Sequence, residues 1–360
     1  PGPVVVDIPK DVATELFTAP ETYDVDIDLP GYQPTTVPNY LQIQKSLQLL
    51  QEAERPLILV GAGVLHAQAT EQLLTFAQQY NIPVVSTLLG MAGMHGYYSA
   101  NQAIQQCDVL FNFGSRFDDR LTGDLEVFAK GAKVVHVDID PAELGKNVKT
   151  EVPIVADAKM ALEALLKEEV QTKDTTPWVQ HVQQMRKDYP LWYTEQEDGT
   201  MLPQQALEMI HEITKGDAIV TTDVGQHQMW AAQYYKLNNP NHWVTSGGLG
   251  TMGFGFPAAI GAQIAKPDAR VISIVGDAGF QMTAQELSLL QEFRYPVKVI
   301  ILNNNSLGMV RQWQEIFYEE RYSESLVQVQ PDFVKLAEAY NIPGNRVDTV
   351  EEARKVFEET

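Results

Sequence analysis

The chain has 360 residues, 44% of them hydrophobic and 20% charged, and a formal net charge of −21 at pH 7. This composition leaves room for two domains with cores of their own, and the negative charge argues against a nucleic-acid or anionic-membrane partner. No apolar run approaches the ~18 residues that span a bilayer. The single cysteine, Cys107, cannot form an intramolecular disulfide, which favours a reducing, cytoplasmic location such as the bacterial cytosol.

An isolated apolar run opens the chain. Residues 3–8 predict a buried strand with no earlier strand to pair with, so we expect residues 1–12 to be the remnant of a preceding domain. Residues 13–38 are rich in Pro, Asp and Thr and predict a linker.

A first α/β unit is predicted over residues 39–167. Apolar strands at residues 57–60, 84–87, 109–113 and 134–138 alternate with helical stretches such as residues 67–80. This alternation predicts a parallel, doubly wound sheet. Residues 168–200 are polar and predict a second linker, although Trp178, Trp192 and Tyr193 suggest that this segment packs on something.

A second α/β unit is predicted over residues 201–360. Its clearest strands are residues 271–275 and 297–302, and a helix between them should begin at Thr283, with Glu286 completing a capping box, and run to about Phe293. A helical stretch ends the chain at a point where another strand would be expected. The predicted fold class is α/β, with two doubly wound parallel-sheet domains.

Polar residues follow both of those strands. Gly276-Asp277-Ala278 ends the first strand and Asn303-Asn304-Asn305 ends the second. Because the carboxyl ends of neighbouring parallel strands meet at one edge of a sheet, Asp277 and Asn304 should converge. One carboxylate with amide and carbonyl oxygens suits a hard cation such as Mg²⁺.

These two strings also resemble the thiamine-diphosphate motif, Gly-Asp-x followed by Asn-Asn, with 24 residues between Ala278 and Asn303. Further strings at residues 116–120, 224–230, 245–257 and 307–313 are similar to the catalytic subunit of acetohydroxyacid synthase (acetolactate synthase). On these residues the chain is identified as a member of that family.

The resemblance implies a thiamine diphosphate site in the second unit. Met252 would support the bent cofactor, His227 would meet a diphosphate oxygen, and Mg²⁺ would be held by Asp277, Asn304 and the backbone carbonyl of Ser306. The residues implied for this cofactor are Val224, Gly225, Gln226, His227, Gly250, Met252, Gly276, Asp277, Ala278, Gly279, Asn304, Leu307, Gly308 and Met309.

Two glycine patterns leave an alternative open. Residues 248–253 satisfy Gly-x-Gly-x-x-Gly after a predicted strand at residues 243–245, which alone would suggest a nicotinamide dinucleotide site. Gly61-Ala62-Gly63 follows another strand and suits an anionic ligand at a helix N-terminus, but it lacks the third glycine.

The resemblance assigns the second pattern to FAD. Asp138 closes a strand, where it could accept ribose hydroxyls, and the Arg-Phe-Asp-Asp-Arg string favours the flavin-binding type of enzyme. Between Leu89 and Met91 the family carries about a dozen more residues, so the flavin loop here is shorter or different. The residues implied for FAD are Gly61, Ala62, Gly63, Thr87, Leu88, Gly93, Met94, His95, Gly114, Ser115, Arg116, Asp118, Arg120, Asp138, Ile139, Asp157, Ala158, Gln228 and Met229.

The activity implied is decarboxylation of pyruvate and ligation of its two-carbon unit to a second 2-ketoacid, pyruvate or 2-ketobutyrate, in branched-chain amino-acid synthesis. Met252, Arg120 and Trp313 would be the catalytic residues, the last two by selecting the second ketoacid. The implied partners are a second copy of the chain, in a homodimer or homotetramer, and a small regulatory subunit.

The alternatives are a pyruvate oxidase, a nicotinamide-dependent oxidoreductase and a noncatalytic fragment. In the family a glutamate of an N-terminal pyrimidine-binding domain activates the cofactor, and no residue here matches it. We therefore expect this chain alone to be inactive.

Overall fold

The computed structural model describes residues 12, 15, 16, 18, 33–87 and 92–359. The strand expected over residues 3–8, most of the first expected linker and the residues Leu88, Leu89 and Met91 lie outside this part of the chain. Residues 35–360 form one unit that contains both sheets. Within the described residues no helix is both long and apolar enough to cross a bilayer.

The first sheet has five strands in the order β2-β1-β3-β4-β5, and every pairing is parallel. The strands are β1 (Pro56–Val60), β2 (Val84–Ser86), β3 (Val109–Phe113), β4 (Lys133–Asp138) and β5 (Val152–Val155). The four strands expected here are confirmed, and β5 is an addition.

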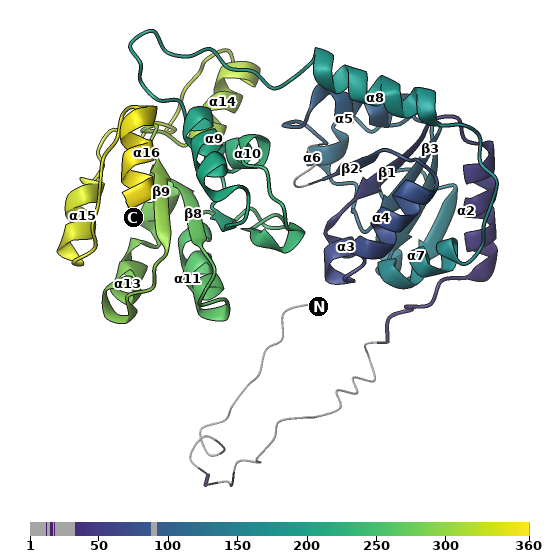
Figure 1. Ribbon diagram of the computed structural model, residues 1–360, viewed down its shortest axis with the longest axis horizontal. Coiled ribbons are helices and arrows are strands. Elements are labelled where there is room, and N and C mark those ends of the chain that lie inside the picture. The colour runs from purple at the N-terminus through teal and green to yellow at the C-terminus, as the bar shows by residue number, and fades with distance from the viewer. Residues whose placement is uncertain (1–11, 13–14, 17, 19–32, 88–91, 360) are drawn as a thin grey trace. The chain divides into compact units, whose positions relative to one another are not determined.

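Helices cover both faces of this sheet (Figure 1). One face packs against α2 (Tyr40–Glu52), α3 (Ala62–His66), α4 (Thr70–Gln79) and α7 (Ala158–Leu166). The other face packs against α5 (Tyr98–Gln106) and α8 (Thr176–Asp188), while the short helices α6 (Asp119–Thr122) and η1 (Pro141–Glu143) follow β3 and β4. The helix expected over residues 67–80 begins only at Thr70, because Gln68 takes a left-handed conformation with φ 53°.

Helix α8 lies inside the segment expected to be a linker. Its Trp178 is buried, and the indole Nε1–H donates to the carbonyl oxygen of Pro56 at 2.9 Å. The Tyr193 hydroxyl donates a hydrogen bond to the carboxylate of Glu208. Packing of these two aromatic residues is therefore confirmed, whereas Trp192 is 79% exposed and the expectation for it was wrong.

The second sheet has four parallel strands in the order β7-β6-β8-β9. They are β6 (Ile219–Thr222), β7 (Trp243–Thr245), β8 (Val271–Gly276) and β9 (Lys298–Leu302). In both sheets the first strand in sequence lies between the second and the third. The chain therefore adds strands first on one side of that strand and then on its other side. Ligands of open α/β sheets bind at this switch point. The expected α/β class with two parallel sheets is confirmed.

Helices also flank the second sheet on both faces (Figure 1). One face packs against α9 (Pro203–Thr214), α10 (Gln226–Tyr234) and α16 (Val350–Glu359). The other packs against α11 (Gly255–Ala265), α13 (Leu287–Phe293) and α15 (Phe333–Ala339). The remaining elements are α12 (Asp277–Met282), α14 (Gly308–Phe317), η2 (Pro240–His242) and η3 (Ala284–Glu286).

The capping box expected at Thr283 does not form. A helix already begins at Asp277, directly after β8, and Thr283 ends it with no side-chain cap bond. The Thr283 hydroxyl instead donates to the carbonyl oxygen of Gly253 at 3.1 Å. The segment between β8 and β9 is therefore three short helical pieces, since a tertiary contact takes the hydroxyl that a cap would use.

Candidate functional site

The carboxylate of Asp277 is buried at the carboxyl end of β8. It is 1% exposed and occupies the first turn of α12. Burial raises the pKa of this carboxyl, and the amide of Gln330 and the backbone N–H groups of Ala278 and Asn304 oppose the rise. The Gln330 side chain that donates to Asp277 also accepts from Asn303 Nδ2 at 2.9 Å, so the loops after β8 and β9 converge, as the sequence predicted.

The loop after β9 also meets the start of α10. The Asn304 side-chain amide donates to Gln226 Oε1 at 3.2 Å, and Gln226 in turn donates to Gln312 Oε1 at 3.2 Å. A Cβ atom on Gly308 would lie 2.1 Å from Gln226 Oε1 and 2.6 Å from Asn304 Nδ2. A side chain at position 308 would therefore displace the Gln226 and Asn304 amides from these positions.

His227 is wedged between two glycines of the site. Cβ atoms added to Gly225 and Gly276 would lie 2.8 Å from its Cε1 and 2.9 Å from its Nδ1. Burial lowers the pKa of His227 to about 4, against a hydrogen bond with the backbone of Asp223 that raises it. With this pKa the ring is neutral at pH 7. Its Nε2 has no hydrogen-bond partner among the described residues, so this nitrogen is left to contact a ligand.

Met252 lies on an irregular turn between β7 and α11. Its side chain is half-buried, and the neighbouring Gly250 and Gly253 have φ of 66° and 83°, which favour glycine. Gly248 and Leu249 before them are exposed. The segment after β7 is thus a glycine-rich turn beside β6, and no dinucleotide geometry is needed to explain its glycines.

The other residues implied for thiamine diphosphate lie on these same loops. Gly276 ends β8, and the others follow β6, β8 and β9 at the carboxyl edge of the second sheet: Val224, Gly225, Ala278, Gly279, Leu307 and Met309.

The donor set near Asp277 fits Mg²⁺. It offers one buried carboxylate and one amide side chain, and among the described residues no ion pair neutralises the carboxylate. The bridge between Ser306 and Leu326 is closed by the N–H groups of Leu307 and Val327, and neither of these bonds uses the Ser306 carbonyl oxygen. No group of three or more His, Cys, Asp or Glu side chains in the described ranges could hold a metal, so a metal here would rely on amide and carbonyl oxygens, as Mg²⁺ can.

The first sheet has a second glycine-lined site at its own switch point. Cβ atoms on Gly61 and Gly63 would lie 2.0 Å and 2.7 Å from the backbone of Gly114. The Gly63 N–H donates to the Gly114 carbonyl oxygen at 3.1 Å, and Gly114 has φ 63°. Bare backbone from the ends of β1 and β3 is thereby brought together, which suits a dinucleotide.

Around this site the implied flavin residues play different structural parts. Asp138 is half-buried, burial raises the pKa of its carboxyl, and it accepts from the Asp140 N–H at 3.0 Å. Asp118 and Asp157 cap the N-termini of α6 and α7. Arg116 pairs with Asp118 at 3.7 Å on the surface.

The remaining implied flavin residues are distributed as follows. Thr87 follows β2, Ala62 begins α3, Ser115 is buried after β3, Ile139 follows β4, Ala158 begins α7, and Gln228 and Met229 lie on α10.

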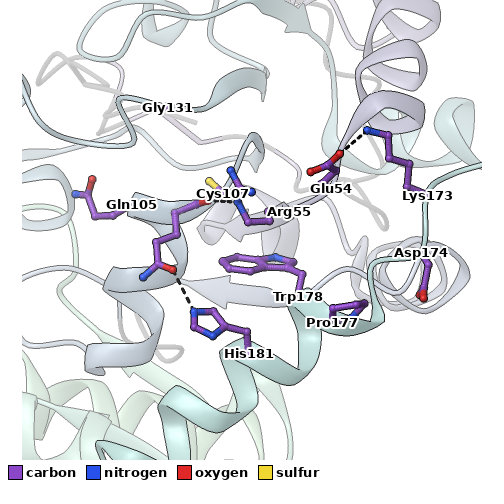
Figure 2. Close-up of a pocket in the computed structure, with 11 residues that line it drawn as sticks. Glu54, Arg55, Gln105, Cys107, Gly131, Lys173, Asp174, Pro177, Trp178 and His181 are labelled. Carbon is purple, nitrogen blue, oxygen red and sulfur yellow. Dashed lines mark hydrogen bonds and ion pairs between the residues drawn. The ribbon is translucent and has the colours of Figure 1, made fainter.

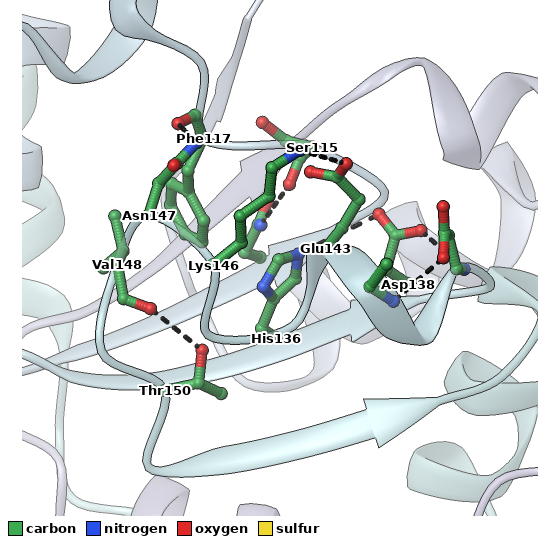
Figure 3. A network of polar contacts seen from close by, with 12 residues as sticks. Ser115, Phe117, His136, Asp138, Glu143, Lys146, Asn147, Val148 and Thr150 are labelled. Atoms are coloured by element: carbon green, nitrogen blue, oxygen red, sulfur yellow. Dashed lines mark hydrogen bonds and ion pairs between the residues drawn. The ribbon is translucent and has the colours of Figure 1, made fainter.

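A network of polar contacts adjoins Asp138 (Figure 3). His136 has no exposed surface, and burial lowers its pKa to about 4. Its ring packs edge-on against Phe117, whose carbonyl oxygen accepts from Asn147 at 2.9 Å. Phe117, between Arg116 and Asp118, has a left-handed backbone conformation with φ 52°.

Arg120 and Trp313 meet in the structure. The guanidinium carbon of Arg120 lies 4.7 Å from the centroid of the Trp313 ring, a cation–π distance. Arg120 also reaches Met94 Sδ at 3.8 Å, and its backbone carbonyl oxygen lies 2.4 Å from where a Gly93 Cβ would be. Burial, and then the Arg120 charge, lower the pKa of His95.

A hollow of about 840 Å³ lies away from both glycine sites. Figure 2 shows it lined by Arg55, Cys107 and Trp178, near the amino ends of β1 and β3. Cys107 is 1% exposed, and burial raises the pKa of its thiol to about 12.

Sequence reasoning missed two residues of the candidate site. Gln330 donates to Asp277 across 53 positions of sequence, and no local pattern indicates that. Asp223 directly follows β6 and has no exposed surface, and its place directly before Val224-Gly225 was the available signal.

Comparison with known proteins gives two family matches. The family described as "Thiamine pyrophosphate enzyme, central domain" matches residues 43–165, and "Thiamine pyrophosphate enzyme, C-terminal TPP binding domain" matches residues 223–360.

Individual proteins match over almost the whole chain. It is 47% identical to the acetolactate synthase large subunit of Lactococcus lactis, covering 97% of this chain and 62% of that protein. It is 45% identical to a probable acetolactate synthase large subunit of Methanocaldococcus jannaschii, covering 100% and 64%. It is 43% identical to the acetolactate synthase large subunit of Haemophilus influenzae, covering 100% and 66%. The chain therefore spans less than two thirds of the length of these relatives.

Proposed function

Because this chain belongs to the thiamine pyrophosphate enzymes and is a homologue of acetolactate synthase large subunits, we propose that it provides the flavin-binding and diphosphate-binding parts of an acetolactate synthase. That enzyme joins the two-carbon unit of pyruvate to a second pyruvate or to 2-ketobutyrate, in branched-chain amino-acid synthesis. A cytoplasmic location belongs to the same proposal.

One observation carries the proposal. Asp277, Asn304 and Gln226 come from loops after three different strands and meet at the switch point of the second sheet. A diphosphate bound there would repel the buried carboxylate unless a cation lay between them. The oxygen donors of Asp277, Asn304 and Ser306 would hold that cation. Thiamine diphosphate, when bound, supplies the electron sink for decarboxylation.

The chain's own residues have distinct tasks in this proposal. Gln226 and the neutral ring of His227 contact the diphosphate, and Met252 supports the organic part of the cofactor. Arg120 pairs with the carboxylate of the second ketoacid, and Trp313 forms an apolar wall beside it. The distance of 4.7 Å between the last two groups supports a shared task.

The glycine-lined switch point of the first sheet would take FAD. Its support is the approach of Gly61 and Gly63 to Gly114 and the half-buried carboxylate of Asp138. We further propose a second copy of the chain as a partner, and a small regulatory subunit, since the relatives are named large subunits.

The metal assignment is tested by calorimetry of thiamine diphosphate binding with and without Mg²⁺. Asp277→Ala should abolish the Mg²⁺-dependent part of binding. Asp332→Ala, which removes an exposed helix cap and a surface ion pair with Lys335, is the matched control. Equal affinity in Asp277→Ala and the unmodified protein would refute the metal site.

The activity is tested on a complete enzyme supplied with pyruvate, thiamine diphosphate, Mg²⁺ and FAD. Acetolactate is the expected product. Acetyl phosphate with peroxide would indicate a pyruvate oxidase instead, consumption of NADH an oxidoreductase, and no product a binding module.

A further inference from the structure

The turn that carries Met252 is attached to the far end of the helix that begins with Asp277. The hydroxyl of Thr283, just after α12, donates to the carbonyl oxygen of Gly253 at 3.1 Å. A Cβ atom on Gly253 would lie 3.1 Å from Met282 Cβ and 3.2 Å from Thr283 Cγ2. The turn therefore rests directly on the end of α12.

A buried carboxylate also binds the same turn. Asp223, at the end of β6, has no exposed surface, and its Oδ1 accepts from the Phe254 N–H at 3.1 Å. The N–H groups of Gly253 and Gly255 also interact with it. One end of the carboxylate is thus surrounded by backbone donors of the turn.

The other carboxylate oxygen faces α12. Asp223 Oδ2 has no hydrogen-bond partner among the described residues, and it lies 1.5 Å from the position a Cβ on Gly279 would take. Asp223 therefore occupies the space between the Met252 turn and the helix that follows β8.

This arrangement is costly for a core residue. Burial raises the pKa of the Asp223 carboxyl, and no ion pair to it occurs in the part of the chain that the structure describes. A buried carboxyl group with an oxygen that lacks a hydrogen-bond partner lowers stability. An apolar residue would fill the space at less cost, but it could not bind the N–H groups of the turn.

We propose that Asp223 and Thr283 are positioning residues that fix the Met252 turn under the organic part of the cofactor, without contributing to diphosphate binding. Thr221 assists from β6, since its hydroxyl donates to the Gly255 carbonyl oxygen at 2.8 Å. This inference rests on the proposed function. Its consequence is selective: loss of either residue should weaken binding of the whole cofactor more than binding of its diphosphate.

The experiment compares two ligands, thiamine diphosphate and inorganic diphosphate, each with Mg²⁺, by calorimetry. Thr283→Val keeps the side-chain shape and removes the hydroxyl, so thiamine diphosphate should bind about fivefold more weakly, while inorganic diphosphate binds as before. Thr283→Ser restores a hydroxyl and should recover most of the affinity. Asp223→Ala removes the acceptor of several N–H groups and should give a larger selective loss.

A second readout follows Met252 without any ligand. In protein labelled with ¹³C at the methionine methyl groups, Met252→Leu identifies the Met252 signal. Thr283→Val should shift or broaden this signal, and Thr283→Ser should restore it.

The outcomes separate the two proposals. Unchanged affinities and an unchanged Met252 signal in Thr283→Val, or an equal loss for both ligands, would overturn the positioning role. If the unmodified protein binds neither ligand, the proposed function fails, and the Met252 signal still decides the inference. If Asp223→Ala does not fold, Thr283→Val decides alone.

Discussion

Gly279→Ala should destabilise the protein, whereas Gly261→Ala should stabilise it, although both glycines lie in helices beside the second sheet. Alanine is favoured over glycine inside a helix by about 0.5–1 kcal/mol. At Gly261 nothing lies within 4 Å of the new Cβ, so the full gain is expected there.

At Gly279 the same Cβ would lie 1.5 Å from Asp223 Oδ2 and 2.7 Å from its Cγ. The carboxylate cannot easily move away, because it is fully buried and its Oδ1 accepts from Phe254. Overpacking of this kind costs about 1–3 kcal/mol. Subtraction of the helix gain leaves a net loss of up to about 2.5 kcal/mol for Gly279→Ala.

Urea unfolding followed by far-UV circular dichroism measures both variants. The two free energies of unfolding should differ by about 1–3 kcal/mol, in opposite directions from the unmodified protein. In an Asp223→Ala background the cost of Gly279→Ala should largely disappear, since the atoms that clash are gone. A Gly279→Ala variant as stable as Gly261→Ala would refute the contact between Asp223 and α12.

Three further outcomes are expected. Burial lowers the pKa of His136 to about 4, so between pH 6.5 and 4 the unfolded chain binds more protons than the folded protein, and stability falls as the pH drops. Subtracting the pH profile of stability of His136→Leu from that of the unmodified protein should isolate this slope. Two parallel profiles would contradict the prediction. Trp178→Phe removes the buried hydrogen bond to Pro56 and should cost about 1–3 kcal/mol in thermal unfolding, whereas Trp192→Phe, at a side chain 79% exposed, should change little. Trp313→Leu in a complete enzyme should reduce the preference for 2-ketobutyrate over pyruvate, an effect of about 1–3 kcal/mol for one methylene, and an unaltered product ratio in a competition assay would exclude Trp313 from acceptor selection.

The strands were predictable where apolar runs were long and uninterrupted. All residues of β3 and β8 are buried, and both were expected. Strand β5 was missed because Pro153 interrupts a run of four residues. Since β5 is an edge strand, it can accept a proline that a central strand could not.

Helix α8 was missed because most of its surface is polar. Only Trp178 and Met185 are buried among its 13 residues, so too few apolar positions repeat to predict a helix. The capping box failed for a different reason, because the Thr283 hydroxyl has a distant backbone partner that no local pattern contains.

The candidate site shows the same division. The loops after β8 and β9 were predictable because each follows its own apolar strand, and parallel topology brings their ends together. The roles of Gln330 and of the Asp223 carboxylate could not be predicted, because their partners, Asp277 and Phe254, lie 53 and 31 positions away in the sequence.

The burial of Cys107 gives the protein an intrinsic reporter. Only the thiolate reacts with alkylating reagents, and a thiol 1% exposed with a pKa of about 12 presents almost none at neutral pH. Labelling must therefore wait until the core residues packed around Cys107, which ends α5 just before β3, move apart. Since Cys107 is the single cysteine of the chain, the rate of its modification measures how often the first α/β unit opens around it. Opening of the second α/β unit gives no labelling signal.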